Sequence, residues 1–451
     1  MRGEKTNIMF ELIRKALESA DPYLAVKRSL TFKEGKLRVK ETEFKIKGKV
    51  HVLAIGKASC KMARALFDVL PEEMIEKSLV VTKYGYTDGC PKGVRVIEAG
   101  HPVPDENSLL AGKLGLELAK NVKKEDILLT LISGGGSALF VYPAGDISLN
   151  DLKITNELLL RSGATIREIN TVRKHISRVK GGRLAKAVKG TVISLIISDV
   201  IGNDVSSIAS GITAPDPTTY RDAYEILVKR GIWEKLPESV REHIEMGLKG
   251  LVEETPKSLP NVHNFIIADN EKACEAVVEK ARELGFNSAV MATTLEGEAR
   301  EIALAVGSIV EEIAKKDRPL KRPALMVFGG EWTVTVGDSK GLGGPNQEFA
   351  LSIARKIAGL NATVVAFDTD GTDGPTEVAG GIVDGKTLGK LEDAGIDVEK
   401  TLKEHDSYHA LKKVGALLKT GPTGTNVNSM VIAIVEKTSS ETSNNYQRQY
   451  L

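Results

Sequence analysis

The chain of 451 residues is too long for one ordinary hydrophobic core, so we expect two domains. Its 42% hydrophobic and 27% charged residues are typical of soluble globular proteins and exclude a disordered or fibrous chain. The net charge of +2, from basic residues dispersed among acidic ones, argues against nucleic-acid binding.

The apolar runs of the chain are too short to cross a membrane. TVISLIIS at 191–198 has the length of a strand, and the N-terminus lacks the regions of a secretory signal. We therefore expect a cytoplasmic protein without a membrane partner. The chain has only three Gln residues but 62 Lys and Arg residues. Few Gln and many basic residues are associated with proteins of thermophiles.

The chain has three cysteines, Cys60, Cys90 and Cys274. They are far apart and odd in number, so the sequence indicates neither a disulfide framework nor a zinc cluster. We expect all three to be packing residues.

Helices and strands alternate along the first half of the chain. FELIRKALESA, from residue 10, has apolar residues at helical spacing, and VHVLAIGKASCKMARALFDVL at 50–70 is typical of a buried strand, a Gly turn and a helix. Further strands are expected in SLVVTKYG, VRVIEAG, DILLTLISGGGSALF and TVISLIISDVIGND. Such alternation requires crossover connections and predicts a mostly parallel sheet with helices on both faces.

A second run of strands and helices begins after EETPKSLPN at 253–261. It predicts a second α/β domain, with the boundary near 240–261. We assign residues 1–250 to a Rossmann-like N-terminal domain and residues 251–437 to the second domain. Residues 438–451 are polar and aperiodic, and we interpret them as a tail.

A lysine, a run of glycines and an aspartate directly follow three of the apolar strands. Ligands of open parallel sheets bind beyond the carboxyl ends of the strands. Lys57 would bring positive charge to phosphoryl oxygens, although most lone lysines are solvated surface groups. The run after DILLTLI predicts a phosphate cradle, because residues without Cβ let successive amides point at an anion, and a tight turn is the alternative. The cradle consists of Ser133, Gly134, Gly135, Gly136 and Ser137.

Other polar residues of the first half are candidates for function, and each has an alternative interpretation. Asp199, at a strand end, is a candidate for accepting a hydroxyl proton or holding Mg²⁺, and we expect its strand to neighbour that of Lys57. Asn203 is a candidate for steering a phosphate, while Asp204 beside it is suited to cap a helix. Arg173, in a cationic helical stretch, either lies on a solvated face or forks onto the carboxylate of an anionic substrate.

Acidic and amide residues also follow turns in the second half. FDTDGTDGP at 367–375 resembles a calcium loop, but its glycine stands at the fourth position and no Glu at the twelfth. Asp368 and Asp370 remain candidates for binding Mg²⁺, with an Asx-turn network as the alternative. Three further residues either bind substrate or cap a helix: Glu331, Asn346 and Gln347.

GGIVDGKT at 380–387 matches the phosphate-loop pattern. A loop of this pattern binds phosphate only when it directly follows a buried strand. The preceding DGPTEVA is rich in turn residues, and Ile382 and Val383 have the character of a short core-directed strand. We interpret the segment as a Gly-rich turn before a helix.

Nine segments, in order, resemble motifs of the glycerate 2-kinase family: AIGKAS, GHPVPDENS, LISGGGSALF, NTVRKHISRVKGGRLA, ISDVIGND, SGITAPDPTTY, GGEWTVTV, GGPNQEFALSIA and FDTDGTDGPT. The resemblance runs from about residue 10 to 435. It implies a Rossmann-like N-terminal domain, a C-terminal domain of the MOFRL type and a site in the cleft between them.

The implied activity is the ATP-dependent phosphorylation of D-glycerate at its 2-hydroxyl, with Mg²⁺ as the divalent cation. Lys57 and Asp199 stand where the family has its implicated lysine and aspartate. Many relatives have Arg where this chain has Pro345, so the candidate cations for substrate or transferring charge are Arg173, Arg183 and Lys340. A homodimer is the common default for such enzymes.

Two alternatives stay open. Many relatives are labelled hydroxypyruvate reductases, but the chain lacks the G-x-G-x-x-G turn with an acidic residue about twenty positions later that binds NAD(P)H. The other alternative is a non-catalytic binder of phosphorylated metabolites.

Overall fold

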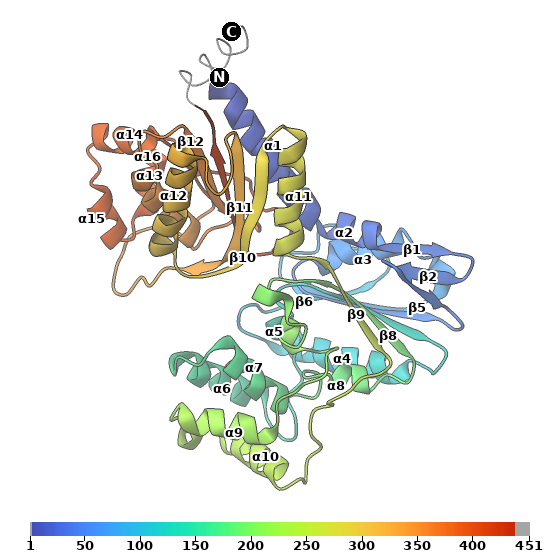
Figure 1. Cartoon of the computed structure of the whole chain (residues 1–451). Helices are drawn as coiled ribbons and strands as arrows, with labels where there is room; N and C mark the ends of the chain where they lie inside the picture. Colours follow the sequence, from blue (N-terminus) through green and yellow to red (C-terminus); the bar gives the residue numbers. More distant parts are fainter. Residues whose placement is uncertain (1, 438–451) are drawn as a thin grey trace. The chain divides into compact units, whose positions relative to one another are not determined.

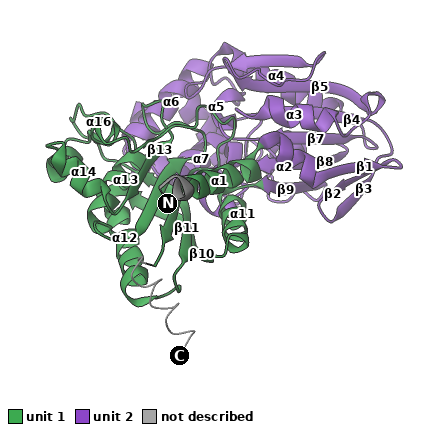
Figure 2. Ribbon diagram, turned by 90° about the horizontal axis from the view of Figure 1, so that it is seen from above, with its two compact units in different colours: residues 1–21, 268–451 green, residues 22–267 purple. Residues whose placement is uncertain are grey.

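A computed structural model describes residues 2–437, and the chain divides into two compact units (Figures 1 and 2). One unit comprises residues 22–267, and the other joins residues 1–21 to residues 268–451. Each contains a six-stranded sheet with helices, so the predicted α/β class is confirmed. Within the described part of the chain, no helix is both long and apolar enough to cross a membrane.

The sheet of residues 22–267 has the strand order β6-β5-β4-β7-β8-β9. Pairing is parallel from β6 through β8, and the apolar strands β4 and β7 are buried along their whole length. The chain runs outward from β4 to one edge and then from β7 to the other, which makes the carboxyl ends of β4 and β7 the topological switch point where ligands bind. The strands are β4 (Val50–Ile55), β5 (Ile75–Lys83), β6 (Arg95–Ala99), β7 (Ile127–Ile132), β8 (Thr191–Ile197) and β9 (Val262–Ala268).

Helices and a small sheet complete this unit. Capping boxes begin α4, α6, α7 and α9, which explains why these helices start where they do. Helices α6, α7, α9 and α10 pack around a core of their own that includes Tyr220 (Figure 1). The helices are α2 (Pro22–Ser29), α3 (Ser59–Phe67), α4 (Glu106–Asn121), α5 (Gly136–Leu139), α6 (Leu149–Arg161), α7 (Ile166–His175), α8 (Arg183–Lys186), α9 (Tyr220–Lys229) and α10 (Glu238–Leu248). Strands β1 (Leu30–Lys33), β2 (Lys36–Val39) and β3 (Thr42–Lys45) form an antiparallel sheet.

The sheet of the other unit has the order β10-β11-β15-β12-β13-β14 and is mixed, since only β10 and β11 pair in parallel. Helices α1 and α11 lie on one face of it, and α12 and α13 lie on the other (Figure 1). The strands are β10 (Asn287–Glu298), β11 (Ala324–Thr333), β12 (Ala362–Asp368), β13 (Gly380–Asp384), β14 (Leu417–Leu418) and β15 (Ser429–Val435). The helices are α1 (Arg2–Ala20), α11 (Asn270–Glu283), α12 (Ala299–Lys316), α13 (Pro345–Lys356), α14 (Thr387–Asp393), α15 (Val398–Lys403) and α16 (Ser407–Lys413).

The two units are not divided where the sequence predicted. Strand β9 belongs to the first sheet, which moves the boundary from residue 250 to residue 267, and α1 belongs to the second unit. Helix α1 packs on α11, where Glu11 pairs with Lys280 at 3.0 Å, and the hydroxyl of Thr425 donates to the carbonyl of Ala20 at 2.6 Å. Helical spacing shows that α1 is a helix, but its packing partner lies more than 250 residues away. The predicted tail at 438–451 is outside the described residues.

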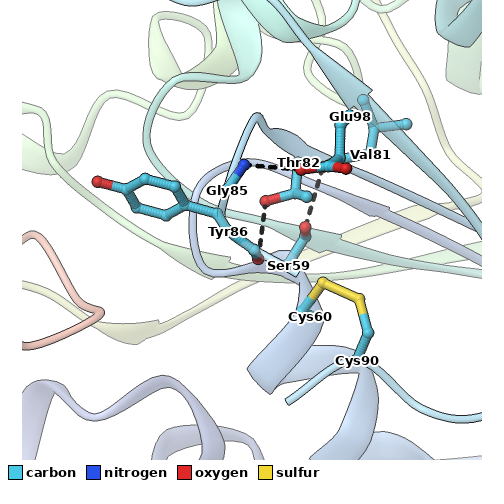
Figure 3. Close-up of a disulfide and its surroundings, with 8 residues drawn as sticks. All are labelled: Ser59, Cys60, Val81, Thr82, Gly85, Tyr86, Cys90 and Glu98. Atoms are coloured by element: carbon cyan, nitrogen blue, oxygen red, sulfur yellow. Dashed lines mark hydrogen bonds between the residues drawn. A yellow bond between two sulfur atoms is a disulfide. The ribbon is translucent and has the colours of Figure 1, made fainter. Parts of the chain in front are cut away.

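Cys60 and Cys90 form a disulfide, so the prediction that all three cysteines are packing residues is wrong for this pair (Figure 3). The bond ties the loop after β5 to the first turn of α3. Hydrogen bonds hold the same region, from the Ser59 hydroxyl to the carbonyl of Val81 and from the Thr82 hydroxyl to the carbonyl of Tyr86 (Figure 3). The third cysteine, Cys274, is free and buried.

Replacing both Cys60 and Cys90 with Ala should lower the free energy of unfolding by about 3 kcal/mol, because the bond closes a loop between residues 30 apart. Thermal unfolding of wild type and variant, with and without a reductant, measures this. Reductant should lower the Tm of the wild type and leave the double variant unchanged. Equal Tm values for oxidised wild type and variant would contradict a stabilising bond.

Candidate active site

Backbone contacts join the loops that follow β4 and β7. The amide of Lys57 donates to the carbonyl of Gly134 at 2.9 Å, and the amide of Ala58 donates to the hydroxyl of Ser133 at 3.1 Å. Ser133 is buried, so its hydroxyl holds the two loops together and faces no ligand. The predicted phosphate cradle and Lys57 are therefore parts of one rigid arrangement at the switch point of the sheet.

The glycine-rich loop has unused donors. Four consecutive amides, those of Gly134, Gly135, Gly136 and Ser137, donate to no group in the described part of the chain. Gly135 has a φ of +91°, a conformation that favours glycine. Consecutive free amides in a turn are suited to bind an anion, so the phosphate cradle stays a prediction that this geometry allows.

Asp199 and His101 approach this loop from other elements. A Cβ at Gly134 would lie 2.4 Å from Oδ2 of Asp199, and a Cβ at Gly135 would lie 3.1 Å from Cδ2 of His101 and 3.4 Å from Cγ of Lys57. The strand of Asp199 is β8, which is separated from β4 by β7, so the expectation of neighbouring strands is wrong. The loop lies between Lys57 and Asp199 and brings both to one place.

The charges at this site are not neutralised within their unit. Lys57 forms no ion pair with any described residue. Burial raises the pKa of the Asp199 carboxyl, and the positive charge of Lys57 lowers it in part. A carboxyl with a raised pKa next to an unpaired cation and free amides is an arrangement suited to moving a proton beside an anion.

Sequence reasoning missed His101. Its pKa is lowered to about 4, first by burial and then by the positive charges of Lys57 and Lys83. The imidazole is therefore neutral at neutral pH and presents one N–H donor beside Gly135. The signal was available in GHPVPDENS, one of the motifs of the family resemblance, because a histidine there follows strand β6 at its carboxyl end.

Replacing His101 with Gln should flatten the dependence of stability on pH. As the pH falls from about 6.5 to 4, the unfolded chain takes up a proton at this residue and the folded chain does not, so the wild type loses stability. Gln does not titrate, and the loss between pH 7 and 4.5 should be smaller in the variant. Calorimetric Tm values of wild type and variant at pH 7, 5.5 and 4.5 measure it. Parallel curves for His101→Gln and wild type would contradict the assignment.

The other unit holds a buried polar cluster around Asp373. Its carboxylate accepts hydrogen bonds from the backbone amides of Asn346 (3.0 Å) and Gln347 (2.8 Å) at the start of α13, and from both side-chain amides. Asn346 and Gln347 are 1% and 0% exposed, so these predicted substrate ligands instead hold Asp373. Their carbonyl oxygens Oδ1 and Oε1 are buried without a hydrogen-bond partner.

Asp368 and Asp370 follow β12 next to that cluster. The amide of Asp370 donates to Asp368 Oδ1 at 3.1 Å, and the hydroxyl of Ser429 donates to Asp368 Oδ2 at 3.3 Å and accepts from Asn346 at 2.9 Å. Burial and then the negative charge of Asp370 raise the pKa of Asp368 to about 7. Two interacting carboxylates that form no ion pair with a described residue are suited to bind a positive ion. Within residues 2–437, no group of three or more His, Cys, Asp or Glu is placed to hold a metal, but Mg²⁺ that accompanies a nucleotide needs only one or two carboxylates.

The remaining predicted residues are less well placed. Glu331 is exposed on β11 opposite Glu296, and Asn203 lies in a partly exposed turn with a φ of +58°. Arg183 donates to the hydroxyl of Tyr220 and the carbonyl of Glu253, whereas Lys340 is exposed. Arg173 lies on α7 and donates to Asn156 at 2.8 Å.

Comparisons with known proteins identify the family of this chain. A family model described as a domain of unknown function, DUF4147, matches residues 8–245, and the model of the MOFRL family matches residues 324–429. A glycerate 2-kinase of Pyrococcus horikoshii is 60% identical over 95% of this chain and 97% of its own. The crystal structure of a glycerate kinase of Thermotoga maritima has a TM-score of 0.87 at 43% identity, over 96% of this chain and 100% of that chain. The chain belongs to the MOFRL-type glycerate 2-kinase family.

One similar protein carries another name. A putative hydroxypyruvate reductase of Agrobacterium vitis is 40% identical over 94% of this chain and 93% of its own. It is more distant than the glycerate 2-kinase of Pyrococcus horikoshii. The family resemblance drawn from the sequence motifs is confirmed, and the reductase name belongs to the more distant relative.

The structure explains two features of the sequence, Pro345 and the match of GGIVDGKT to the phosphate-loop pattern. Pro345 is the first residue of α13, where a helix needs no N–H and where Asp373 accepts from the next two amides. GGIVDGKT is strand β13 followed by a turn in which the Thr387 hydroxyl donates to Asp384 at 2.9 Å, while Lys386 is exposed. The hydroxyl that a phosphate loop directs to a metal is used within its own turn.

Proposed function

We propose that this protein transfers the γ-phosphoryl group of ATP to the 2-hydroxyl of D-glycerate and releases 2-phospho-D-glycerate and ADP. The observation that carries the proposal is the loop of four free amides between Lys57 and Asp199 at the switch point of a parallel sheet. Membership of the glycerate 2-kinase family supports it.

Residues of the first unit carry the chemical step in this proposal. The amides of Gly134 to Ser137 bind phosphate oxygens, Lys57 neutralises negative charge of the group in transfer, and an N–H of neutral His101 donates a hydrogen bond to it. Asp199 orients the 2-hydroxyl and accepts its proton as the new O–P bond forms and the bond to ADP breaks. Burial of Asp199 raises its pKa and so makes it a better proton acceptor than an exposed aspartate.

Asp368 and Asp370 would hold the divalent cation. Mg²⁺, when bound, neutralises phosphate charge, and Asp368 and Asp370 supply carboxylate oxygens of the kind it prefers. Asp373 holds the start of α13 beside them through Asn346 and Gln347. A cytoplasmic location and a homodimer complete the proposal, and gel filtration tests the latter.

Formation of ADP from ATP, Mg²⁺ and D-glycerate tests the proposal directly. The assay is run with identification of the phosphoglycerate isomer and, in parallel, with NADH and hydroxypyruvate. Production of 2-phosphoglycerate supports the kinase. Loss of NADH without ADP formation would overturn it in favour of the reductase, and ligand-induced stabilisation without turnover would favour a binder.

A further inference from the structure

Two cations of the unit formed by residues 22–267, Lys180 and Arg173, have no carboxylate partner among the described residues. Lys180 is 2% exposed, and its ammonium donates to the carbonyl oxygens of Ser137 at 2.8 Å and Phe140 at 3.3 Å. Arg173 donates through Nε to Asn156 at 2.8 Å. Neither cation forms an ion pair with any residue that the structure describes.

Burial of these two positive charges without an anionic partner costs free energy. Burial and the nearby charge of Arg173 lower the pKa of Lys180 to about 7, and burial also lowers the pKa of Arg173. Buried charge is normally paired, because unpaired charge loses its hydration without compensation. Two neighbouring cations without a counter-ion fit a site whose missing partner is a bound anion.

A chain of hydrogen bonds links the glycine-rich loop to α7, on which Asn170 and Arg173 are three residues apart and so lie on the same face. The hydroxyls of Ser137 and Ser210 are 2.9 Å apart, and Ser210 donates to Oδ1 of Asn170 at 3.0 Å. Since Ser210 gives its only proton to Asn170, Ser137 is the donor in their bond and can turn its proton toward a ligand. Ser210 has a φ of +57°, which is strained for a residue with a Cβ, and its carbonyl accepts from the amide of Gly181.

The solvent exposure of the side chains distinguishes residues that can contact a ligand from buried residues that hold those residues in position. Arg173 and Ser137 are partly exposed, whereas Lys180, Ser210 and Asn170 are buried. The accessible pair therefore consists of a guanidinium fork and a hydroxyl, and the buried three fix its geometry.

We propose that Arg173 and Ser137 bind the carboxylate of the acid that is phosphorylated, and that Lys180 is a positioning residue that holds Ser137 in place. This inference rests on the proposed kinase function. Gly134, beside Asp199, and Ser137 are three residues apart, so their Cα atoms lie within about 11 Å of each other. The proposed carboxylate subsite at Ser137 and the carboxyl of Asp199 therefore border the same short loop. The planar guanidinium of Arg173 matches a carboxylate in two parallel hydrogen bonds. The subsite selects short 2-hydroxy acids over neutral analogues.

Arg173→Gln tests the carboxylate subsite with two substrates, D-glycerate and its uncharged amide. The variant should lose about 10²-fold in kcat/KM for glycerate, the effect of one charge-assisted pair, and change little for the amide or in the KM for ATP. Arg167→Gln, on the exposed face of the same helix, is the matched control and should behave as wild type. A raised KM for ATP with an unchanged preference for glycerate would assign the cations to phosphate, and an equal loss with both substrates would make Arg173 structural. Wild type without ADP formation would instead refute the proposed function itself.

Lys180→Gln and Lys180→Met test the positioning role. Gln keeps N–H donors for the carbonyls of Ser137 and Phe140, whereas Met fills the space without them. Met should raise the KM for glycerate by about 10-fold, and Gln should restore most of that loss, with both variants folded by Tm. Wild-type KM values for Lys180→Met, or equal defects in the two variants, would overturn the role of Lys180.

Discussion

Replacing Lys57 with Ala is expected to lower kcat by a factor on the order of 10² or more while the fold survives. Lys57 has no ion pair with a described residue, and its structural hydrogen bond to Gly134 comes from the backbone, which the substitution keeps. The side chain is therefore free to act on the group in transfer. Because charge is redistributed over the phosphoryl and leaving oxygens in the transition state, where the ammonium stabilises it more than in the ground state, kcat should fall more than the KM for glycerate rises.

The pKa of His101 gives a second test of the Lys57 side chain that does not depend on enzyme turnover. The charge of Lys57 helps to lower the pKa of His101, so the pKa of His101, followed by NMR, should rise in Lys57→Ala. Lys120→Ala, at an exposed position of α4, is the control for both readings. Turnover within twofold of wild type would remove Lys57 from the reaction, even if the pKa of His101 moves.

The strand ends of the first sheet were predictable because each combines two local signals. An apolar run long enough for a strand is followed at once by glycine or by a single charged residue, as at Lys57, Gly134 and Asp199. Such signals are local, and in a parallel sheet the carboxyl ends lie at one edge. The order of the strands was not local, so the placement of β7 between β4 and β8 had to come from the structure.

The features that escaped prediction all depend on contacts between distant residues. Nothing near Cys60 indicates that Cys90 lies beside it, and nothing near α1 indicates that it packs on α11. Asn346 and Gln347 are the types of residue that bind substrates, but here their amides satisfy the buried carboxylate of Asp373. A polar residue at a turn is thus ambiguous until its neighbours are known.

Replacing Asp199 with Asn should lower kcat by a factor on the order of 10² to 10⁴, because the amide keeps the shape of the carboxylate and loses the ability to accept a proton. The pKa of Asp199 is raised, so protonation should cause the acid limb in a plot of kcat/KM against pH for the wild type. That limb should disappear in the variant. An acid limb of unchanged midpoint in Asp199→Asn would show that another group accepts the proton.

The Tm of Asp199→Asn distinguishes a role of Asp199 in proton transfer from a structural role. A carboxyl whose pKa is raised on folding holds its proton more tightly when folded, so its ionised form destabilises the fold above the pKa of the unfolded chain. Asn carries no charge, and the Tm of Asp199→Asn at pH 7 should therefore equal or exceed that of the wild type. A variant that is both inactive and much less stable would mean that Asp199 supports the glycine-rich loop, whereas a stable, inactive variant assigns the carboxylate to the chemistry.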